Sequence, residues 1–391
     1  MKKQTALSAL TMSALAIPNV TDAAVAPDKK TLSLRYTQYK EAPMPQERVQ
    51  AVSGSSTGRY DIDILQFRFL TPIQNKYSLD TSVSYETMSG ASAYGSSVNA
   101  DGQTEVHMSG ASIEESRLDA SLQGTRYFKE GTLGSSVAIS TENDYESMAL
   151  GVSGSLELYQ KHTTLLSSLS VSHDELSPTD ADLYQGARLE ADGENKRSFS
   201  LYQGLSQVLD KFSTLQIGMG YTHLSGYLSD PYRTRDDRPD SREQSTLSLQ
   251  YRYYLRSFGG MALHWDYRYY QDDWGILANT ISSSVWKDVE VSGLHLTLAP
   301  NVRYHWQHAA DFYSVDASSN SELYSSDYRL SAYGAVSVGI DLQYHHQDTS
   351  FTLSLSQYVS DEDWGATGSQ DTETPALVDF TTFSLGVDYH F

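Results

Sequence analysis

The chain has 391 residues, no cysteine and a formal net charge of −21, from 49 acidic side chains against 28 lysines and arginines. The lack of cysteine excludes disulfide bonds and thiol chemistry. The acidic balance argues against nucleic acid as a partner, because the phosphates would be repelled.

Residues 1–24 have the pattern of a secretory signal peptide. Lysines follow the first methionine, residues 6–17 are largely apolar, and the segment ends in the small residues Ala23 and Ala24. We expect residues 1–24 to be removed on export and residues 25–391 to form the mature domain. After the signal peptide, no run approaches the roughly 18 apolar residues that a membrane helix needs.

The mature chain contains sixteen segments in which polar and apolar residues alternate, the period of a strand with a different solvent on each face. They lie at residues 31–40, 59–70, 76–87, 114–127, 132–142, 147–159, 163–173, 197–208, 212–224, 243–256, 260–271, 275–286, 292–307, 328–344, 350–359 and 377–391. A sheet in lipid must close, because an open edge would leave backbone groups unsatisfied. The predicted fold is therefore all-β, a transmembrane antiparallel up-and-down β-barrel of about 16 strands over residues 25–391.

The connections between these segments support an even-stranded barrel. The longest follow odd-numbered strands, near residues 41–58, 88–113, 174–196, 225–242 and 308–327. Those that follow even-numbered strands are all short. An outer-membrane barrel sorts its connections in this way, with tight turns in the periplasm and long loops outside. The 28 tyrosines also suit the aromatic girdles at the two membrane interfaces.

Segment 292–307 shows the lipid face most clearly, because apolar or aromatic residues occupy every second position from Leu294 to Trp306. This pattern predicts that Leu298 faces mid-bilayer lipid and that Thr297 faces the lumen. Pro300 cannot donate to the ladder, so a bulge or a weakened pair is expected there. The alternation does not assign faces to the strands near residues 62–69 and 275–286.

The final strand alternates in the same way. Its apolar positions are Phe383, Leu385, Val387, Tyr389 and Phe391. A chain that stops on such a strand resembles the terminal strand of bacterial outer-membrane barrels, in which the last phenylalanine is part of the assembly signal. The resemblance implies that these five residues are recognised by the barrel-assembly machinery.

Several separate motifs resemble one family. They are Tyr60-Asp-Ile62, Met88-Ser-Gly-Ala-Ser92, Gly226-Tyr-Leu-Ser-Asp-Pro-Tyr232, Tyr267-Arg-Tyr-Tyr270 with Asp272-Asp-Trp-Gly275, Ser325-Ser-Asp-Tyr-Arg-Leu330 and the closing strand. Over essentially the whole mature chain they are similar to the bacterial domain-of-unknown-function family 3570. The family has no assigned activity. The resemblance implies redox work in the envelope, through gene neighbours thought to be small lipoproteins, thioredoxin-like proteins and flavin-transferring enzymes.

Two short repeats stand out. Met88-Ser-Gly-Ala-Ser92 recurs as Met108-Ser-Gly-Ala-Ser112, and Asp273-Trp-Gly275 recurs as Asp363-Trp-Gly365. Turn chemistry explains both, with glycine at a positive φ and tryptophan at the headgroups. The alternative is a shared role in shaping the mouth of the barrel.

If the apolar faces contact lipid, the other faces place charged side chains in the lumen. The candidates are Arg68, Asp80, Arg117, Asp119, Arg252, Asp266, Arg268, Arg303, Arg329 and Asp341. One interpretation is a lattice of ion pairs that braces the wall. The other is a constriction whose charges select the solutes that pass, and the two interpretations are compatible.

No metal, cofactor or enzyme activity is expected. The predicted outer loops are acidic, but they contain no twelve-residue calcium loop, so they predict a solvated rim that attracts cations. Histidines suited to catalysis or to a metal occur only at His305 and His308, near Asp311, and at His345 and His346. None has a matching nucleophile nearby in the sequence.

The sequence therefore predicts a barrel in the bacterial outer membrane, in contact with lipid and lipopolysaccharide, that acts as a passive channel for small polar solutes. The alternative is a non-conducting structural or partner-holding barrel that serves a periplasmic redox or electron-transfer system through a periplasmic protein partner. No residue decides between these two functions.

Overall fold

The structure is a computed structural model that describes residues 25–50, 55–110, 113–183, 186–317, 321–365 and 373–391. The predicted signal peptide at residues 1–24 lies outside these ranges. The described chain forms one closed barrel of sixteen strands. These are β1 (Thr31–Glu41), β2 (Asp61–Ile73), β3 (Tyr77–Gly90), β6 (Ile113–Phe128), β7 (Gly131–Thr141), β8 (Tyr145–Leu158), β9 (Thr163–Leu176), β10 (Asn195–Asp210), β11 (Ser213–Gly226), β13 (Ser241–Leu255), β14 (Met261–Asp272), β15 (Leu277–Val291), β16 (Leu294–Gln307), β18 (Tyr333–His346), β19 (Thr349–Asp361) and β20 (Phe380–His390).

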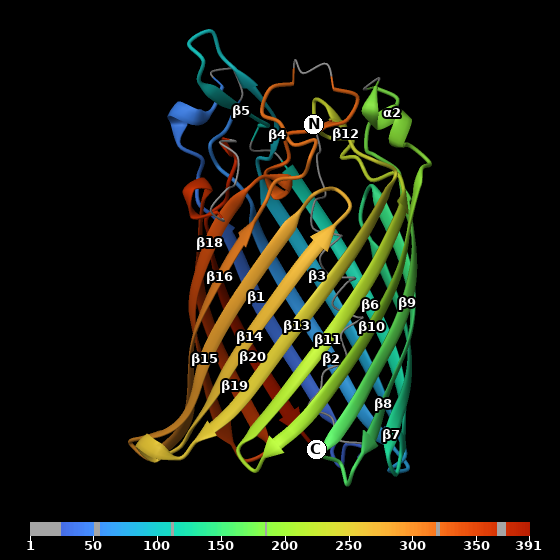
Figure 1. The fold of residues 1–391 in the computed structure, drawn as a ribbon, viewed down its shortest axis with the longest axis vertical. Coiled ribbons are helices and arrows are strands. Elements are labelled where there is room, and N and C mark those ends of the chain that lie inside the picture. The colour runs from blue at the N-terminus through green and yellow to red at the C-terminus, as the bar shows by residue number, and fades with distance from the viewer. Residues whose placement is uncertain (1–24, 51–54, 111–112, 184–185, 318–320, 366–372) are drawn as a thin grey trace.

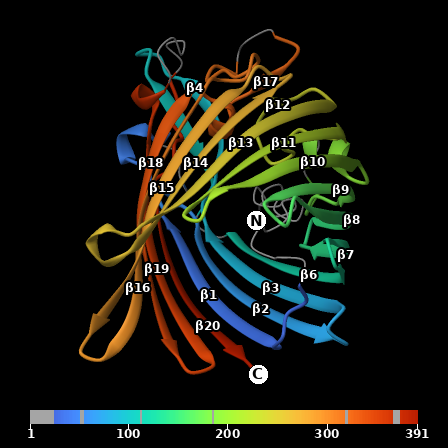
Figure 2. The ribbon, with the colours of Figure 1, turned by 60° about the horizontal axis from the view of Figure 1, so that its bottom comes forward.

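Each strand pairs antiparallel with the strands before and after it in this order, and β1 pairs with β20 to close the sheet (Figures 1 and 2). The fold prediction is confirmed, and each predicted segment corresponds to one strand. Closure pairs the edge groups of the first and last strands with each other, so that neither is left open to lipid.

The two ends of the barrel differ as the connection lengths predict. At the turn end, strands are joined by residues 74–76, 129–130, 159–162, 211–212, 256–260, 292–293 and 347–348. At the loop end, at the top of Figure 1, the long connections carry the remaining elements. These are η2 (Gln46–Arg48), β4 (Ala93–Val98), β5 (Thr104–Met108), α2 (Ala187–Ala191), β12 (Asp236–Asp237), β17 (Tyr324–Ser325), η4 (Tyr328–Leu330) and η5 (Glu362–Trp364). In the described part of the chain no helix has the length and apolar character needed to cross a membrane.

The register separates the two faces of every strand, because residues paired across an antiparallel ladder lie on the same face. It also assigns the inner and outer faces of the two strands whose faces the alternation does not give. In β2, Phe67 lies opposite Leu34 on the outer face, so Arg68 points inward. In β15, Ile281 lies opposite Tyr304 on the outer face and is 47% exposed, so Ser282 points inward.

Leu298 faces outward as predicted. It pairs with Leu342 on one side and with Lys287 on the other. The Lys287 ammonium donates to the carbonyl oxygens of Phe258 and Gly260, 2.5 and 3.4 Å away, in the turn after β13. A lysine that bonds to a turn is typical of the membrane interface. The mid-bilayer depth of Leu298 stays a prediction.

Pro300 has the effect expected of a residue without an N–H. The ladder between β15 and β16 is interrupted between the pairs Ser284–Asn301 and Lys287–Leu298, opposite the proline. The ladder to β18 continues through the pair Pro300–Ile340. The predicted weakened pair is confirmed on one side of the strand.

The seam of the barrel joins the first and last strands through the terminal aromatic residue. Phe391 and Lys30 exchange two backbone hydrogen bonds of 2.9 Å, and the Lys30 ammonium lies 5.6 Å from the centre of the Phe391 ring. Tyr389 stacks on Phe391 with ring centres 5.5 Å apart. Both rings point outward, 47% and 52% exposed. The five predicted assembly residues thus form one apolar stripe beside the seam.

We expect deletion of Tyr389 to Phe391, or Phe391→Ala, to leave export intact and to impair insertion, because only the recognition strand and its seam contacts change. The measurement is the yield of heat-modifiable protein in the outer-membrane fraction, with Tyr159→Ala as a control. Tyr159 is an aromatic residue of a turn and is 80% exposed. Wild-type yield from the Phe391 variants would remove this stripe from the assembly signal.

Candidate functional site

The inner wall of the barrel has two unlike halves. On β7 to β11 most inward positions carry hydroxyl groups or glycine, and neighbouring hydroxyls bond across strands, as in Thr132–Ser155 at 2.8 Å and Ser172–Ser198 at 2.7 Å. These small inward residues include Ser136, Ser140, Ser147, Gly151, Ser153, Ser168, Ser170, Ser200, Gly204, Ser206, Gly218 and Gly220. This part of the wall, called here the hydroxyl wall, presents small polar side chains to the interior.

The other half carries the charges. Nine of the ten predicted lumen residues point inward on it: Arg68, Asp80, Arg117, Asp119, Arg252, Asp266, Arg268, Arg303 and Asp341. Six of them form ion pairs among themselves. The nitrogen–oxygen distances are 2.5 Å for Arg68–Asp80, 3.1 Å for Arg117–Asp119 and 2.7 Å for Arg252–Asp266. The pairs Arg68–Asp80 and Arg252–Asp266 brace neighbouring strands, as expected of an ion-pair lattice, whereas Arg117 and Asp119 lie on the same strand, β6.

The remaining three have no ion-pair partner among the described residues. Asp341 accepts hydrogen bonds from Ser354 and Asn301, at 2.5 and 3.4 Å. Arg268 and Arg303 are exposed to the lumen and lie close enough to repel each other electrostatically. Side chains of this half therefore reach the interior water with uncompensated charge.

Arg329 is not on a barrel strand. The sequence predicts a strand from residue 328, but β18 begins at Tyr333 and Arg329 lies in the 3₁₀ helix η4. The reason is local: the Asp327 carboxylate accepts a 3.1 Å hydrogen bond from the Arg329 backbone N–H and caps the helix. Such side-chain to backbone bonds compete with extended structure.

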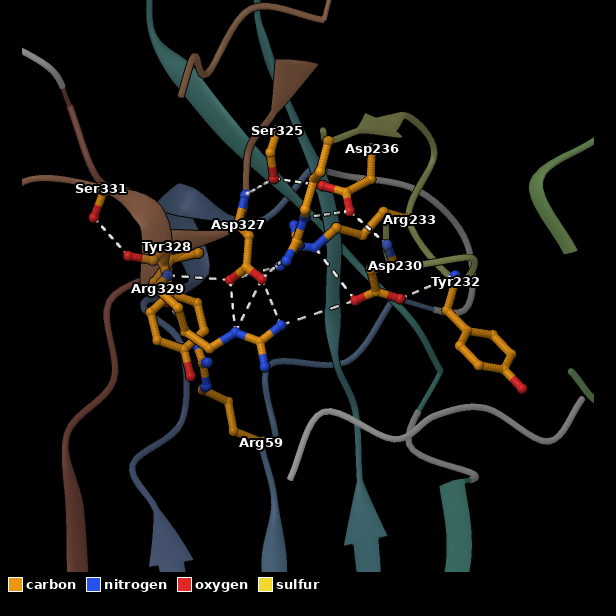
Figure 3. A network of polar contacts seen from close by, with 12 residues as sticks. Arg59, Asp230, Tyr232, Arg233, Asp236, Ser325, Asp327, Tyr328, Arg329 and Ser331 are labelled. Atoms are coloured by element: carbon orange, nitrogen blue, oxygen red, sulfur yellow. Dashed lines mark hydrogen bonds and ion pairs between the residues drawn. The ribbon is translucent and has the colours of Figure 1, made fainter. Parts of the chain in front are cut away.

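Asp327 is the centre of a buried ion network at the loop end (Figure 3). Both of its oxygens accept from Arg329 Nε at 2.9 Å. Arg238 Nη2 lies 3.0 Å from Oδ2, and Arg233 Nη2 lies 3.4 Å from Oδ1. The carboxylate is completely buried. One acid therefore holds three guanidinium groups.

Two further acids balance these three arginines. Asp236 lies 2.7 Å from Arg238 Nε and accepts from the Ser325 hydroxyl. Asp230 lies 3.6 Å from Arg233 Nε. The network thus joins the connection between β11 and β13 to the connection between β16 and β18. Its three positive and three negative charges cancel.

The pKa shifts in the network follow from burial and charge together. Burial alone would raise the pKa of Asp327, but Arg329, Arg233 and Arg238 hold it well below its usual range. Burial raises the pKa of Asp236, and Arg238 offsets part of that shift. A depressed pKa means that the stability from Asp327 is present above about pH 4 and is lost only as the pH falls through the lower folded value.

Other contacts join the loop-end connections into one unit, which we call the cap: the connections β1–β2, β3–β6, β9–β10, β11–β13, β16–β18 and β19–β20. Gln50 N donates to Val106 O at 3.0 Å, and Thr234 N donates to Tyr94 O at 2.9 Å. The Ser96 hydroxyl donates to Val315 O at 2.9 Å. These contacts join the connections β1–β2, β3–β6, β11–β13 and β16–β18, which gather at the loop end, at the top of Figure 1.

The base of the cap is fixed by Arg59. Its Nε lies 2.7 Å from Glu41, at the end of β1, and its Nη1 donates to Ala376 O at 3.1 Å. The guanidinium also lies 5.7 Å from the centre of the Tyr328 ring. Arg59 therefore connects the barrel rim to the last connection and to η4.

The two sequence repeats have different roles in the cap. Ser92 and Ser109 hydrogen-bond to each other, so the Met-Ser-Gly-Ala-Ser repeats lie side by side at the base of the β4–β5 hairpin, although residues 111–112 are outside the described ranges. Trp274 is buried in an apolar cluster with Phe312, whereas Trp364 is 39% exposed. The shared Asp-Trp-Gly pattern therefore does not predict a shared environment.

Sequence reasoning missed the network residues Asp230, Arg233, Asp236, Arg238 and Asp327 as a site. A signal was present, because two of the family-like motifs end in it. The motif from Gly226 to Tyr232 contains Asp230, and the motif from Ser325 to Leu330 contains Asp327 and Arg329. Neither motif alternates with the period of a strand, so the alternation analysis could not use them.

A second buried cluster lies where β6 and β7 reach the cap. Arg117 Nη2 lies 2.8 Å from Glu86, and Arg117 Nη1 lies 3.6 Å from Glu142. The Glu142 side chain is 4% exposed. Burial raises the pKa of Glu142 to about 8, with Arg117 opposing the shift and Asp144 adding to it. Glu142 therefore carries a proton at neutral pH more often than an ordinary glutamate.

This shift predicts a pH dependence of stability. The pKa of Glu142 rises from 4.5 to about 8 on folding. Its stabilisation is therefore complete below about pH 4.5 and is lost as the pH rises through about 8. Glu142→Gln fixes the neutral form and should flatten the change in urea midpoint between about pH 5 and about pH 9. Glu146→Gln, at an exposed position, should keep the wild-type profile. An equally steep profile in Glu142→Gln would contradict the assignment.

The histidines do not assemble a metal site. His305 faces the lumen, where its two ring nitrogens contact Thr280 and Gln307 at 2.9 and 3.3 Å. His345 bonds to Ser350 at 2.8 Å near a turn. Across the described ranges, no group of three His, Cys, Asp or Glu side chains is arranged to hold a metal ion.

Solved structures share this architecture. A structure described as a bacterial polysaccharide outer membrane secretin aligns with a TM-score of 0.53 at 10% identity, over 93% of this chain and 98% of that one. CdiB from Acinetobacter baumannii aligns with a TM-score of 0.51 at 8% identity, over 93% of this chain and 60% of that one. At such low identity the likeness shows the fold alone, which is that of outer-membrane barrels.

No curated protein sequence matches the chain. A family model described as "Protein of unknown function (DUF3570)" matches residues 7–374. The match contains every family-like motif except the closing strand, and the chain therefore belongs to the DUF3570 family.

Proposed function

We propose that this protein is a channel of the bacterial outer membrane for small polar solutes. The observation that supports it best is the polar inner wall. The side chain of Arg68 is 52% exposed although it points into the barrel, and Arg268 and Arg303 are exposed there as well. The hydroxyl wall adds small polar groups to the same interior.

The outer surface supports the location. Large apolar side chains such as Leu65, Ile340 and Leu355 point outward and are 45–49% exposed. An apolar surface of this kind is stable only in contact with lipid. Lipid, lipopolysaccharide and the barrel-assembly machinery are the partners that this surface implies. We propose no enzyme activity and no cofactor.

One observation favours the second candidate, a non-conducting barrel that serves a periplasmic redox or electron-transfer system through a protein partner. The cap crosses the loop end and contains a completely buried ion network, centred on Asp327. A cap that never opens would leave a barrel accessible from the turn end alone.

Conductance across a planar bilayer separates the two candidates. We expect discrete openings from the wild-type protein. In a salt gradient, Arg268→Ala with Arg303→Ala should shift the reversal potential toward cation selectivity, because two uncompensated positive charges leave the wall.

The matched control is Arg252→Ala with Asp266→Ala, which removes one charge of each sign from the same wall. It should leave the reversal potential near the wild-type value. A silent wild-type protein would favour the non-conducting barrel. An open pore with unchanged selectivity in the Arg268 and Arg303 variant would remove these arginines from the conduction path.

A further inference from the structure

We infer that Arg268 and Arg303 form a binding site in the lumen for a small oxyanion, a phosphate or a carboxylate. The inference rests on the proposed function and deepens it, because it names the class of solute. It does not follow from the overall charge of the chain, which is −21.

The first step is that these two arginines differ from most arginines of the inner wall. Arg35 on β1 also points inward without an ion-pair partner among the described residues, but it lies four strands from Arg303 along the sheet. Arg68, Arg117, Arg242 and Arg252 each have a carboxylate oxygen within 2.5 to 2.8 Å. Among the described residues, neither Arg268 nor Arg303 has a carboxylate within ion-pair distance. The nearest inward acid in sequence, Asp266, is already paired with Arg252 at 2.7 Å.

The second step is that the two guanidinium groups face the same space. Arg268 lies on β14 and Arg303 on β16, with β15 between them, where Thr280 is opposite Arg268 and Ser282 is opposite Arg303. Their backbones are therefore two strand spacings apart, roughly 10 Å, and are offset by two residues along the strands, roughly 7 Å, which gives a separation of roughly 12 Å. Long side chains span much of that gap over two small residues, and each charge acts on the other.

Two like charges held together without an acid are unfavourable unless something compensates them. A bound anion would do so. Both arginines keep their heads exposed to the lumen, so a solute can reach them.

The third step is the supply of neutral hydrogen-bonding groups around Arg303. Tyr333 and Tyr358 bond to each other through their hydroxyls, and both lie near enough to Arg303 to feel its charge. His305 follows two residues later and also interacts with both arginines. The Tyr333 hydroxyl, which accepts from Tyr358, can donate to an oxygen of the ligand.

The geometry of the guanidinium group then selects the ligand. Its planar fork makes paired hydrogen bonds to the oxygens of carboxylate or phosphate, whereas a spherical halide can accept no such pair. Two guanidinium groups across a gap of this size suit an anion with at least two oxygens.

The test uses the purified full chain, refolded in zwitterionic detergent, and isothermal titration calorimetry with inorganic phosphate or succinate at constant chloride. Wild type should bind at least one of the two. Arg268→Ala with Arg303→Ala should weaken binding by about tenfold or more, since hydrogen bonds to charged groups are lost. The variant Arg268→Lys with Arg303→Lys keeps both positive charges and loses the planar guanidinium groups. Its affinity should lie between those of wild type and the double-alanine variant.

The control variant Arg252→Ala with Asp266→Ala should bind as wild type does, and heat-modifiable migration should show that each variant is folded. Binding of phosphate alone identifies a phosphate site, and binding of both probes identifies a general oxyanion site. Equal binding by wild type and the double-alanine variant, or no binding to wild type, overturns the inference. The titration is done in detergent and does not depend on conduction. A wild-type protein that binds a probe but does not conduct in the bilayer contradicts the channel and not the binding site. A protein that conducts but binds neither probe contradicts the binding site and not the channel.

Discussion

Asp327→Asn should release the cap while leaving the barrel closed. The substitution keeps the shape of the side chain and removes the one charge that Arg233, Arg238 and Arg329 share. Removal of one partner from a buried ion network costs about 3–5 kcal/mol, since the remaining charges stay buried without compensation. At about 1.4 kcal/mol per factor of ten, the open state of the cap should become roughly a hundredfold to a few thousandfold more populated.

Native-state hydrogen exchange in lipid vesicles measures this effect directly. Amides of the cap, including the backbone N–H of Ser325 and Leu330, should exchange faster, while those of β18 and β19 should not. Asp237→Asn is the matched control, because Asp237 forms an exposed ion pair with Arg235 in the same connection. It should change the free energy of cap opening, as measured by hydrogen exchange, by about 1 kcal/mol or less. If both variants exchange alike, Asp327 does not hold the cap.

Leu355→Arg should destabilise the barrel by about 2–4 kcal/mol, the range for a cation at the bilayer midplane. Leu355 is central in β19, points outward with 49% exposure, and lies between Ile340 and Phe383. The measurement is the free energy of unfolding by guanidinium in lipid vesicles.

The adjacent residue provides the control. Ser354 points inward and donates to Asp341 at 2.5 Å, so Ser354→Arg would place a cation beside an acid that has no ion-pair partner among the described residues. Its cost should be much smaller. Similar costs at positions 354 and 355 would mean that the two faces of β19 are reversed.

The sequence predicted the barrel well because a single physical cause, different solvents on the two faces, acts on every strand. Alternation also gives the face of a strand residue, so nine of the ten lumen candidates lie at inward positions, whereas Arg329 is not on a barrel strand. The sequence could not predict which charges pair, because pairing depends on register. Arg303 lies opposite Ser282 and Ser337, and the acid that it might have met, Asp266, is two strands away.

The cap could not be predicted from alternation. Arg233, Arg238 and Asp327 come from connections that are distant in sequence, and only the folding of those connections brings them together. Alternation also gives the face of a residue but not its height in the membrane, so the mid-bilayer depth of Leu298 stays a prediction.

The division of the inner wall into a hydroxyl wall and a charged half creates a transverse electric field in the lumen. Near Arg268 and Arg303 this field points away from β14 and β16 into the lumen. Its range depends on salt, since the screening length is about 8 Å at physiological ionic strength and about 3 Å at 1 M. At low salt the field should orient a dipolar solute with its negative end toward β15. At high salt the field is screened, and the same solute should have no preferred orientation.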